Sequence, residues 1–140
     1  MITIIAAMTK DRVIGFHGSI PWHIPEDLHL FKHLTWGNTV VMGRTTYTSL
    51  GQPFKGRKNI ILSRTLKIED SQEIIVCRTF KECLSRGEKF GRDLFIIGGE
   101  SVYRLALPMA DCLYLSLIPG SFQGDTFFPE IDPFVRAESR

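Results

Sequence analysis

Cysteine is scarce in this chain of 140 residues, and its apolar runs are short. The three cysteines, Cys77, Cys83 and Cys112, are odd in number and have no metal-ligand spacing. They therefore predict free, buried thiols in a cytoplasmic protein rather than a disulfide framework or a zinc site. The apolar start, Ile2–Met8, is too short to cross a membrane and lacks a preceding basic segment, so we expect a strand there.

The chain also lacks a large excess of either positive or negative charge. The formal net charge is +2, which is too small to indicate a nucleic-acid or membrane partner, and we expect neither. Apolar residues make up 44% of the chain and charged residues 23%, which is ordinary for a globular protein. No internal repeat, low-complexity segment or linker is apparent, so we expect one domain over residues 1–140.

Buried strands and short helices alternate along the chain. Strands are expected at Ile2–Met8, Thr39–Met42, Lys58–Ser63, Glu73–Cys77, Leu94–Ile97 and Leu113–Ile118. Helices are expected from Pro25 to Leu34, from Arg44 to about Leu50, after an N-cap at Thr79 to about Arg86, and from Glu100 to about Leu107. Short connections between alternating elements predict an α/β fold, a single three-layer domain with a mostly parallel central sheet and flanking helices.

One carboxylate in the helix that begins at Pro25 stands out. At a period of 3.6 residues, Asp27 shares a face with Leu30, Phe31 and Leu34, whereas Glu26 lies on the polar face. Two interpretations remain open. Asp27 is either an exposed first-turn aspartate stabilised by the helix dipole, or a carboxylate on an apolar wall that binds a cationic or hydrogen-bond-donating ring.

Two strand-to-helix turns, Gly43–Thr46 and Ile97–Ser101, have the composition of phosphate-binding turns. The carboxyl ends of parallel strands and the N–H groups of helix N-termini bind phosphates, and glycine allows close backbone approach. The G-x-G-x-x-G fingerprint is absent, which disfavours a standard dinucleotide fold. Arg44, Arg64 and Arg78 follow strand ends and would suit a 2′-phosphate, favouring NADPH over NADH, unless they are merely solvated surface residues.

The motif Pro21-Trp22-x-x-Pro25-x-Asp27, preceded by Asp11-Arg12-Val13-Ile14-Gly15, resembles the dihydrofolate reductase family, and the match continues along nearly the whole chain. The resemblance implies NADPH-dependent reduction of 7,8-dihydrofolate to 5,6,7,8-tetrahydrofolate for one-carbon metabolism, with antifolates as inhibitors. It also implies that the loop Asp11–Pro21 closes over the reacting rings.

The resemblance assigns roles to particular residues. Catalytic roles are implied for Asp27, which holds the pterin, and for Trp22 and Ile20 beside it. Substrate contacts are implied for Ile5, Ala6, Asp27, Leu28, Phe31, Leu50, Phe54, Arg57, Ile97, Tyr103 and Ser116. Cofactor contacts are implied for Ala7, Ile14, Gly15, Gly43, Arg44, Thr45, Thr46, Leu62, Ser63, Arg64, Arg78, Gly98, Gly99, Glu100, Ser101, Val102, Tyr103 and Thr126. No metal ligand is expected.

Four of these assignments are more specific. Arg57 matches the residue that clamps the glutamate carboxylate of folate, and Ser116 matches a threonine that supports the aspartate. The Gly98–Gly99 peptide is cis in the family. The segment Gly124–Thr126 matches a loop that braces the closing loop near Gly15.

Two other functions remain open. One is a reductase of the same fold that acts on a pyrimidine of the riboflavin pathway, against which Asp27, Trp22 and Arg57 argue. The other is an inactive, binding-only domain. Family members end in a hairpin, whereas only seven residues follow Pro133, enough for one strand at most. The strand Leu113–Ile118 is then expected to be a sheet edge prone to self-association, unless Phe134–Arg140 pairs with it.

Overall fold

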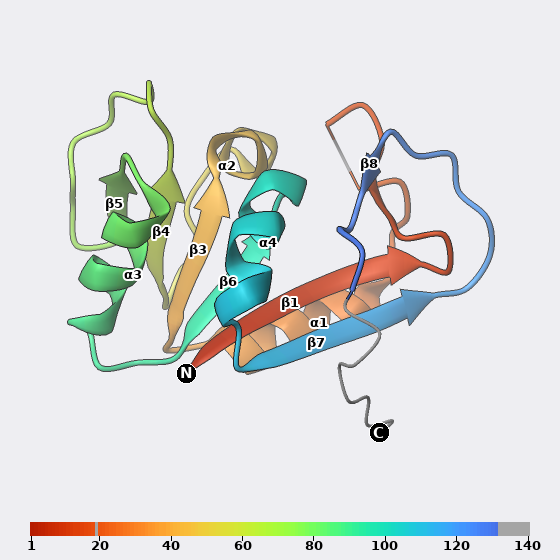
Figure 1. Ribbon diagram of the computed structural model, residues 1–140, viewed down its shortest axis with the longest axis horizontal. Coiled ribbons are helices and arrows are strands. Elements are labelled where there is room, and N and C mark those ends of the chain that lie inside the picture. Colours follow the sequence, from red (N-terminus) through yellow and green to blue (C-terminus); the bar gives the residue numbers. More distant parts are fainter. Residues whose placement is uncertain (19, 132–140) are drawn as a thin grey trace.

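Parallel pairing organises the central sheet of the computed structural model, which describes residues 1–18 and 20–131. Its six strands run in the order β5-β4-β3-β6-β1-β7, and each neighbouring pair is parallel (Figure 1). They are β1 (Ile2–Thr9), β3 (Thr39–Gly43), β4 (Lys58–Leu62), β5 (Ile74–Cys77), β6 (Leu94–Gly98) and β7 (Cys112–Ile118). The predicted strands are confirmed to within one or two residues.

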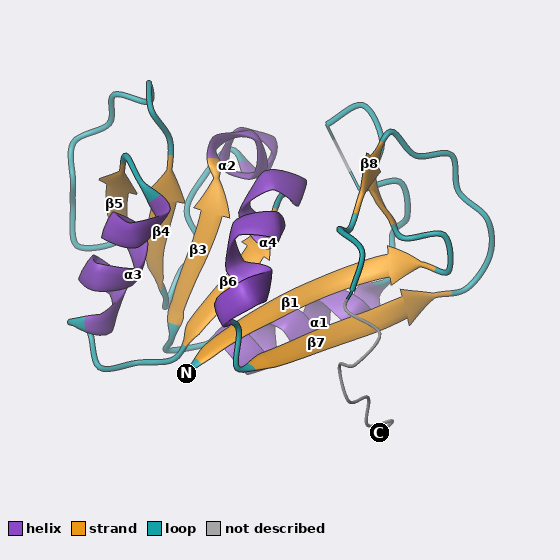
Figure 2. Cartoon of the chain, in the orientation of Figure 1, coloured by secondary structure: helices purple, strands orange, loops and turns teal. Residues whose placement is uncertain are grey.

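Four α-helices connect the strands of the described residues, and they form two layers around the sheet (Figure 2). They are α1 (Pro25–Thr35), α2 (Arg44–Leu50), α3 (Phe80–Glu88) and α4 (Glu100–Ala106), which continues into the 3-10 helix η1 (Leu107–Met109). Figure 2 shows α1 behind the sheet, and α3 and α4 in front of it. None of the helices described is long and apolar enough to span a membrane.

Successive strand residues pack on opposite faces of the sheet. Val40 lies in the cluster that receives Phe31 and Leu34 of α1, while Val41 lies in the cluster that receives Phe80 of α3 and Val102 of α4. Because both faces are covered, the strands are continuous apolar runs, as the sequence indicated. The predicted three-layer α/β fold is confirmed.

Local chemistry explains the helix ends. Thr79 is the predicted N-cap of α3, and its hydroxyl accepts a hydrogen bond from the Glu82 backbone N–H at 3.1 Å. Pro25 begins α1, where a missing N–H leaves no hydrogen bond unmade. At the other end of α1, the Trp36 backbone N–H still donates to the Lys32 carbonyl at 3.0 Å.

Two features differ from expectation. A small antiparallel ribbon joins β2 (Val13–Gly15) to β8 (Thr126–Phe127), and strands this short carry no readable periodicity. Cys112 was predicted to be buried, which is wrong, because it begins β7 at the border of the sheet, where its side chain is exposed. Cys77 and Cys83 are buried as predicted, and all three cysteines are free.

Candidate active site

Two backbone turns meet at the carboxyl edge of the sheet. Gly43 and Gly99 are the N-caps of α2 and α4, and neither helix has a side-chain cap, so their first N–H groups are free to bind a ligand. A Cβ on Gly43 would lie 3.1 Å from Val102 Cγ2. Gly98 has a φ of +137°, and a Cβ there would lie 3.1 Å from the Thr46 hydroxyl oxygen. The peptide between Gly98 and Gly99 is cis, as predicted.

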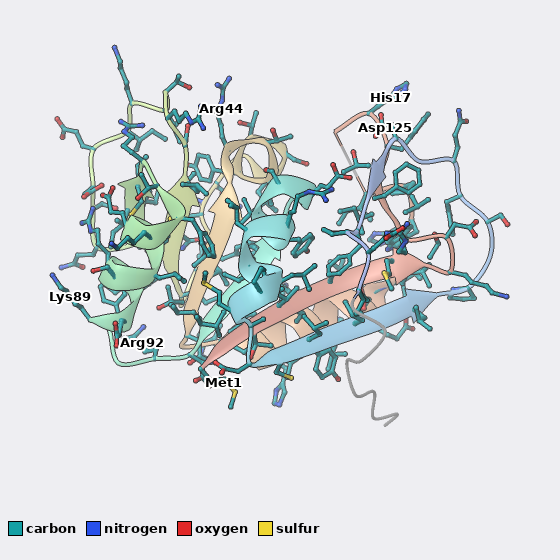
Figure 3. All side chains as sticks on the ribbon, in the orientation of Figure 1. Met1, His17, Arg44, Lys89, Arg92 and Asp125 are labelled. Carbon is teal, nitrogen blue, oxygen red and sulfur yellow. The ribbon has the colours of Figure 1, made fainter. Side chains whose placement is uncertain are left out.

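Guanidinium groups gather beside these turns. Arg44 is exposed, and its Nη1 donates to the Thr65 hydroxyl at 3.1 Å. Arg78 Nη1 donates to the Ser63 carbonyl at 2.8 Å. Both arginines therefore contact the loop that follows β4, where the exposed Arg64 also lies. In Figure 3 Arg44 lies at the edge toward which β3 and β4 point, far from Lys89 and Arg92 at the opposite edge.

The apolar face predicted for α1 is confirmed by its burial. Leu30, Phe31 and Leu34 are half-buried, and so is Asp27, whereas Glu26 is exposed. The Phe31 ring packs on Phe54, with centroids 5.2 Å apart. Asp27 is therefore not wholly exposed, although it lies in the first turn of α1, where the helix dipole also favours a carboxylate.

Several predicted substrate residues adjoin this face. Ile5, Ile97 and Phe54 belong to the cluster that receives Phe31. The predicted substrate residues Leu28 and Leu50 and the predicted catalytic residue Ile20 have exposed side chains. Ser116 on β7 is half-buried and lies opposite Ala7 on β1. Ala6 packs in the opposite layer, toward α4, so only its backbone can face the α1 side.

The side chains of three residues predicted to contact the cofactor make contacts within the protein. Tyr103 is buried and donates its hydroxyl to the Ile5 carbonyl at 3.0 Å, and burial raises the pKa of this phenol. Val102 is buried in the cluster between the sheet and α4. The Glu100 carboxylate accepts the Phe127 backbone N–H at 3.2 Å and so anchors β8.

Arg57 is the most unusual charged residue of the site. Only 7% of it is exposed, and its guanidinium carbon lies 5.3 Å from the Trp36 ring centroid and 5.2 Å from that of Phe54. Burial lowers the pKa of Arg57. Trp36 was not among the predicted site residues. The sign in the sequence that could have indicated its role is a tryptophan directly after the last residue of a helix.

Gly15 and His17, in the loop predicted to close over the rings, contact the segment predicted to brace that loop. The Asp125 backbone N–H donates to the Gly15 carbonyl at 3.0 Å, and the His17 backbone N–H donates to Asp125 Oδ2 at 3.0 Å. The His17 N–H, followed by the Thr126 hydroxyl, holds the pKa of Asp125 below its usual range. Figure 3 shows His17 and Asp125 beside each other. Trp22, which follows this loop, packs edge-on against Phe122, with centroids 5.4 Å apart.

This arrangement, with glycine-containing strand-to-helix turns along one edge of a parallel sheet and a half-buried carboxylate on an apolar helix face, is typical of an α/β enzyme with a nucleotide cofactor. Among the described residues, no group of three His, Cys, Asp or Glu side chains could hold a metal ion.

Comparison with known proteins specifies the class further. The dihydrofolate reductase family model matches residues 1–139. Dihydrofolate reductase of Bacillus subtilis (strain 168) is 40% identical over 134 residues, which cover 94% of this chain and 77% of that protein. Dihydrofolate reductase type 3 of Salmonella typhimurium is 40% identical over 130 residues, which cover 93% and 79%. The solved structure of Enterococcus faecalis dihydrofolate reductase, complexed with NADP(H) and RAB-propyl, has a TM-score of 0.87 at 38% identity and covers 94% of this chain and 79% of that chain. The chain belongs to the dihydrofolate reductase family.

Proposed function

We propose that this chain is an NADPH-dependent oxidoreductase that reduces 7,8-dihydrofolate to 5,6,7,8-tetrahydrofolate, with Asp27 as the residue that holds the pterin. Family membership supports the reaction. The observation that carries the assignment of Asp27 is its half-buried position on the apolar face of α1, next to an exposed Glu26. Antifolates would bind at the same site.

The residues at the strand ends fit NADPH. Gly43–Thr46 and Gly98–Ser101 offer backbone N–H groups where added Cβ atoms would crowd their neighbours, and Arg44 and Arg64 offer positive charge for a 2′-phosphate. The 2.8 Å hydrogen bond from the Arg78 guanidinium to the Ser63 carbonyl fixes the start of the loop that follows β4. When bound, NADPH supplies the hydride that reaches C6 of the pterin.

Asp27 binds and orients the ring. A carboxylate accepts two hydrogen bonds, which suits the amino group and N3–H edge of a pterin. Its negative charge favours the protonated form of the ring at N5, either directly or through a water molecule. The aromatic and aliphatic side chains of Phe31, Ile5 and Ile97 exclude water from the ring faces.

The length of α1 separates the ring from the substrate tail. Trp36 follows Asp27 by nine helical positions, about 14 Å along the axis at 1.5 Å per residue. Arg57 lies beside Trp36, so its guanidinium is a suitable partner for the glutamate carboxylate at the far end of the folate tail. Phe31 and Phe54 lie between the two ends and provide an apolar surface for the benzoyl ring.

Asp27→Asn tests the assignment, with Glu26→Gln as a matched control one residue away on the exposed face. We expect Asp27→Asn to bind ligands nearly normally but to lower turnover at pH 7 by about 10²–10³-fold, the usual effect of removing one electrostatic stabiliser of the transition state. Glu26→Gln should keep normal turnover. The measurement is the absorbance decrease of NADPH with dihydrofolate, with and without an antifolate.

The same assay separates the alternatives. Near-normal turnover of Asp27→Asn would contradict the role of the carboxylate. No NADPH consumption by the unmodified chain would indicate a binding-only domain. Consumption with a riboflavin-pathway pyrimidine, but not with dihydrofolate, would indicate the related reductase.

We infer that residues 1–140 form one domain and that the protein is cytoplasmic, which the three free thiols support. Among the described strands, β7 pairs with β1 alone. The segment Phe134–Arg140, predicted to compete for this edge, lies outside the described residues, so self-association through β7 stays a prediction.

A further inference from the structure

Arg57 is a buried cation without a carboxylate partner. Among residues 1–18 and 20–131, no acidic side chain lies within ion-pair distance of it, and its buried Nε has no hydrogen-bond acceptor. Burial of an unpaired charge is costly, and here it lowers the pKa of the guanidinium. An interaction other than an ion pair must therefore stabilise the buried Arg57 guanidinium when no ligand is bound.

Two aromatic faces replace the counterion. The guanidinium lies near the ring of Trp36 on α1's C-terminal side and near the ring of Phe54 in the loop before β4, at 5.3 and 5.2 Å from the centroids. Both distances are within the range at which a cation is attracted to the negative face of an aromatic ring. The Phe54 backbone is fixed in turn, because its N–H and carbonyl both hydrogen-bond to the Asn59 amide, at 2.9 and 3.0 Å.

The chain around Trp36 is built to seat its indole. Gly56 has a φ of +74°, and a Cβ there would lie 2.5 Å from two indole carbons, so the ring occupies space that only glycine leaves open. The Gly37 N–H donates to the Gly56 carbonyl at 2.9 Å and joins the two segments. Trp36 itself is 62% exposed, so burial in the core does not account for a tryptophan at this position.

We propose that Trp36 and Phe54 are positioning residues that hold the Arg57 guanidinium between two rings for a carboxylate. The two rings attract the cation without a counterion, and the buried Nε has no acceptor among the described residues, so N–H donors of the guanidinium remain available to an anion. A planar carboxylate matches those donors in bidentate fashion. The aromatic pair therefore sets the preference of the enzyme for substrates whose tail ends in a carboxylate. This inference rests on the proposed role of Arg57 at the end of the folate tail.

The test compares two substrates with the same reacting ring. Dihydrofolate carries the glutamate tail, whereas 6-methyl-7,8-dihydropterin lacks it. We expect Trp36→Leu to raise KM for dihydrofolate by about three- to tenfold, the effect of losing one cation–π contact, while kcat stays unchanged. KM for the dihydropterin should not change. Trp36→Phe, which keeps a ring, should restore most of the lost affinity.

A double-mutant cycle separates positioning from general stability. In an Arg57→Leu background, Trp36→Leu should have no further effect on KM for dihydrofolate, because the group it positions is gone. Lys55→Leu is the matched control, since it removes an exposed positive charge from the same loop, and it should leave KM nearly unchanged.

The outcomes distinguish this inference from the proposed function. Suppose that Arg57→Leu raises KM for dihydrofolate but not for the dihydropterin. If Trp36→Leu then leaves both KM values unchanged, or raises both equally, the positioning role of Trp36 is overturned, while the role of Arg57 as the carboxylate clamp stands. If Arg57→Leu affects both substrates equally, the clamp itself is wrong. The positioning role would also be overturned if Trp36→Leu raised KM for dihydrofolate in the Arg57→Leu background by the same factor as in the unmodified protein.

Discussion

Replacement of Gly124 by alanine should disconnect the closing loop from its brace. A Cβ at Gly124 would lie 2.3 Å from Val13 Cγ1 and 2.8 Å from Cγ2. Carbon atoms pack favourably at 3.5–4.0 Å, so the two segments would have to part by about 1 Å or more. Val13 cannot turn away easily, because it is β-branched and only 4% exposed. The φ of Gly124 lies outside the left-handed region, so the cost is steric alone.

The expected cost follows from which part of the fold gives way. Overpacking costs typically about 1–3 kcal/mol. The β2–β8 ribbon is a two-stranded sheet apart from the central sheet, so it should separate before the core rearranges. Separation breaks the hydrogen bonds that Asp125 makes with Gly15 and His17, each 3.0 Å long. A closed loop destabilised by about 1–3 kcal/mol lowers the rate of any step that requires closure by about five- to 150-fold.

Gly124→Ala should therefore lower turnover strongly but lower the stability of the whole fold only slightly. We expect Gly124→Ala to lower turnover of dihydrofolate at least fivefold and the melting temperature by only a few degrees. Val13→Ala in the same chain should restore part of the turnover, because it removes both Cγ atoms and leaves the Val13 Cβ at 3.1 Å. Gln123→Ala, an exposed neighbour in the same loop, is the control. Normal turnover of Gly124→Ala, or no recovery in the double variant, would refute the reasoning.

Two further predictions concern charge. Replacing Arg44 and Arg64 together by alanine should erode the preference for NADPH over NADH much more than it changes KM for dihydrofolate, and equal losses with both cofactors would mean that these arginines do not hold a 2′-phosphate. Because the pKa of Asp125 is depressed in the folded protein, its contribution is fully present above its unfolded value of about 3.9 and is lost as pH falls through the folded value. Melting temperature measured against pH should show this loss below about pH 4, and Asp125→Asn should remove that part of the pH dependence.

Much of the fold is predictable because its causes are local. Strands covered on both faces become continuous apolar runs, and the helix face shared by Asp27, Phe31 and Leu34 follows from the helical period alone. Thr79 could be recognised as an N-cap because its hydroxyl bonds to an N–H only three residues away.

The features that escaped prediction depend on contacts between distant segments. The β2–β8 ribbon joins segments more than 100 residues apart, each too short to show a period. Cys112 has the residue type of a buried side chain, but the strand order places it at the border of the sheet. The burial of Arg57 beside two aromatic rings was not predicted, because it depends on Trp36, which lies 21 positions earlier in the chain.

Helix α1 gives the two ends of the site separate tasks. Under the proposed function, Asp27 near the start of α1 would face the ring, where charge changes during the reaction. Trp36, just past the end of α1, contacts a guanidinium that would bind the same carboxylate in every state of the substrate. Interactions that are equal in the ground state and the transition state change KM, and those that strengthen in the transition state change kcat. Because the two ends are about 14 Å apart along the helix axis, their free-energy effects should add with little coupling. Substitutions around Arg57 should therefore change the affinity of the enzyme for the substrate tail without changing the reaction at Asp27.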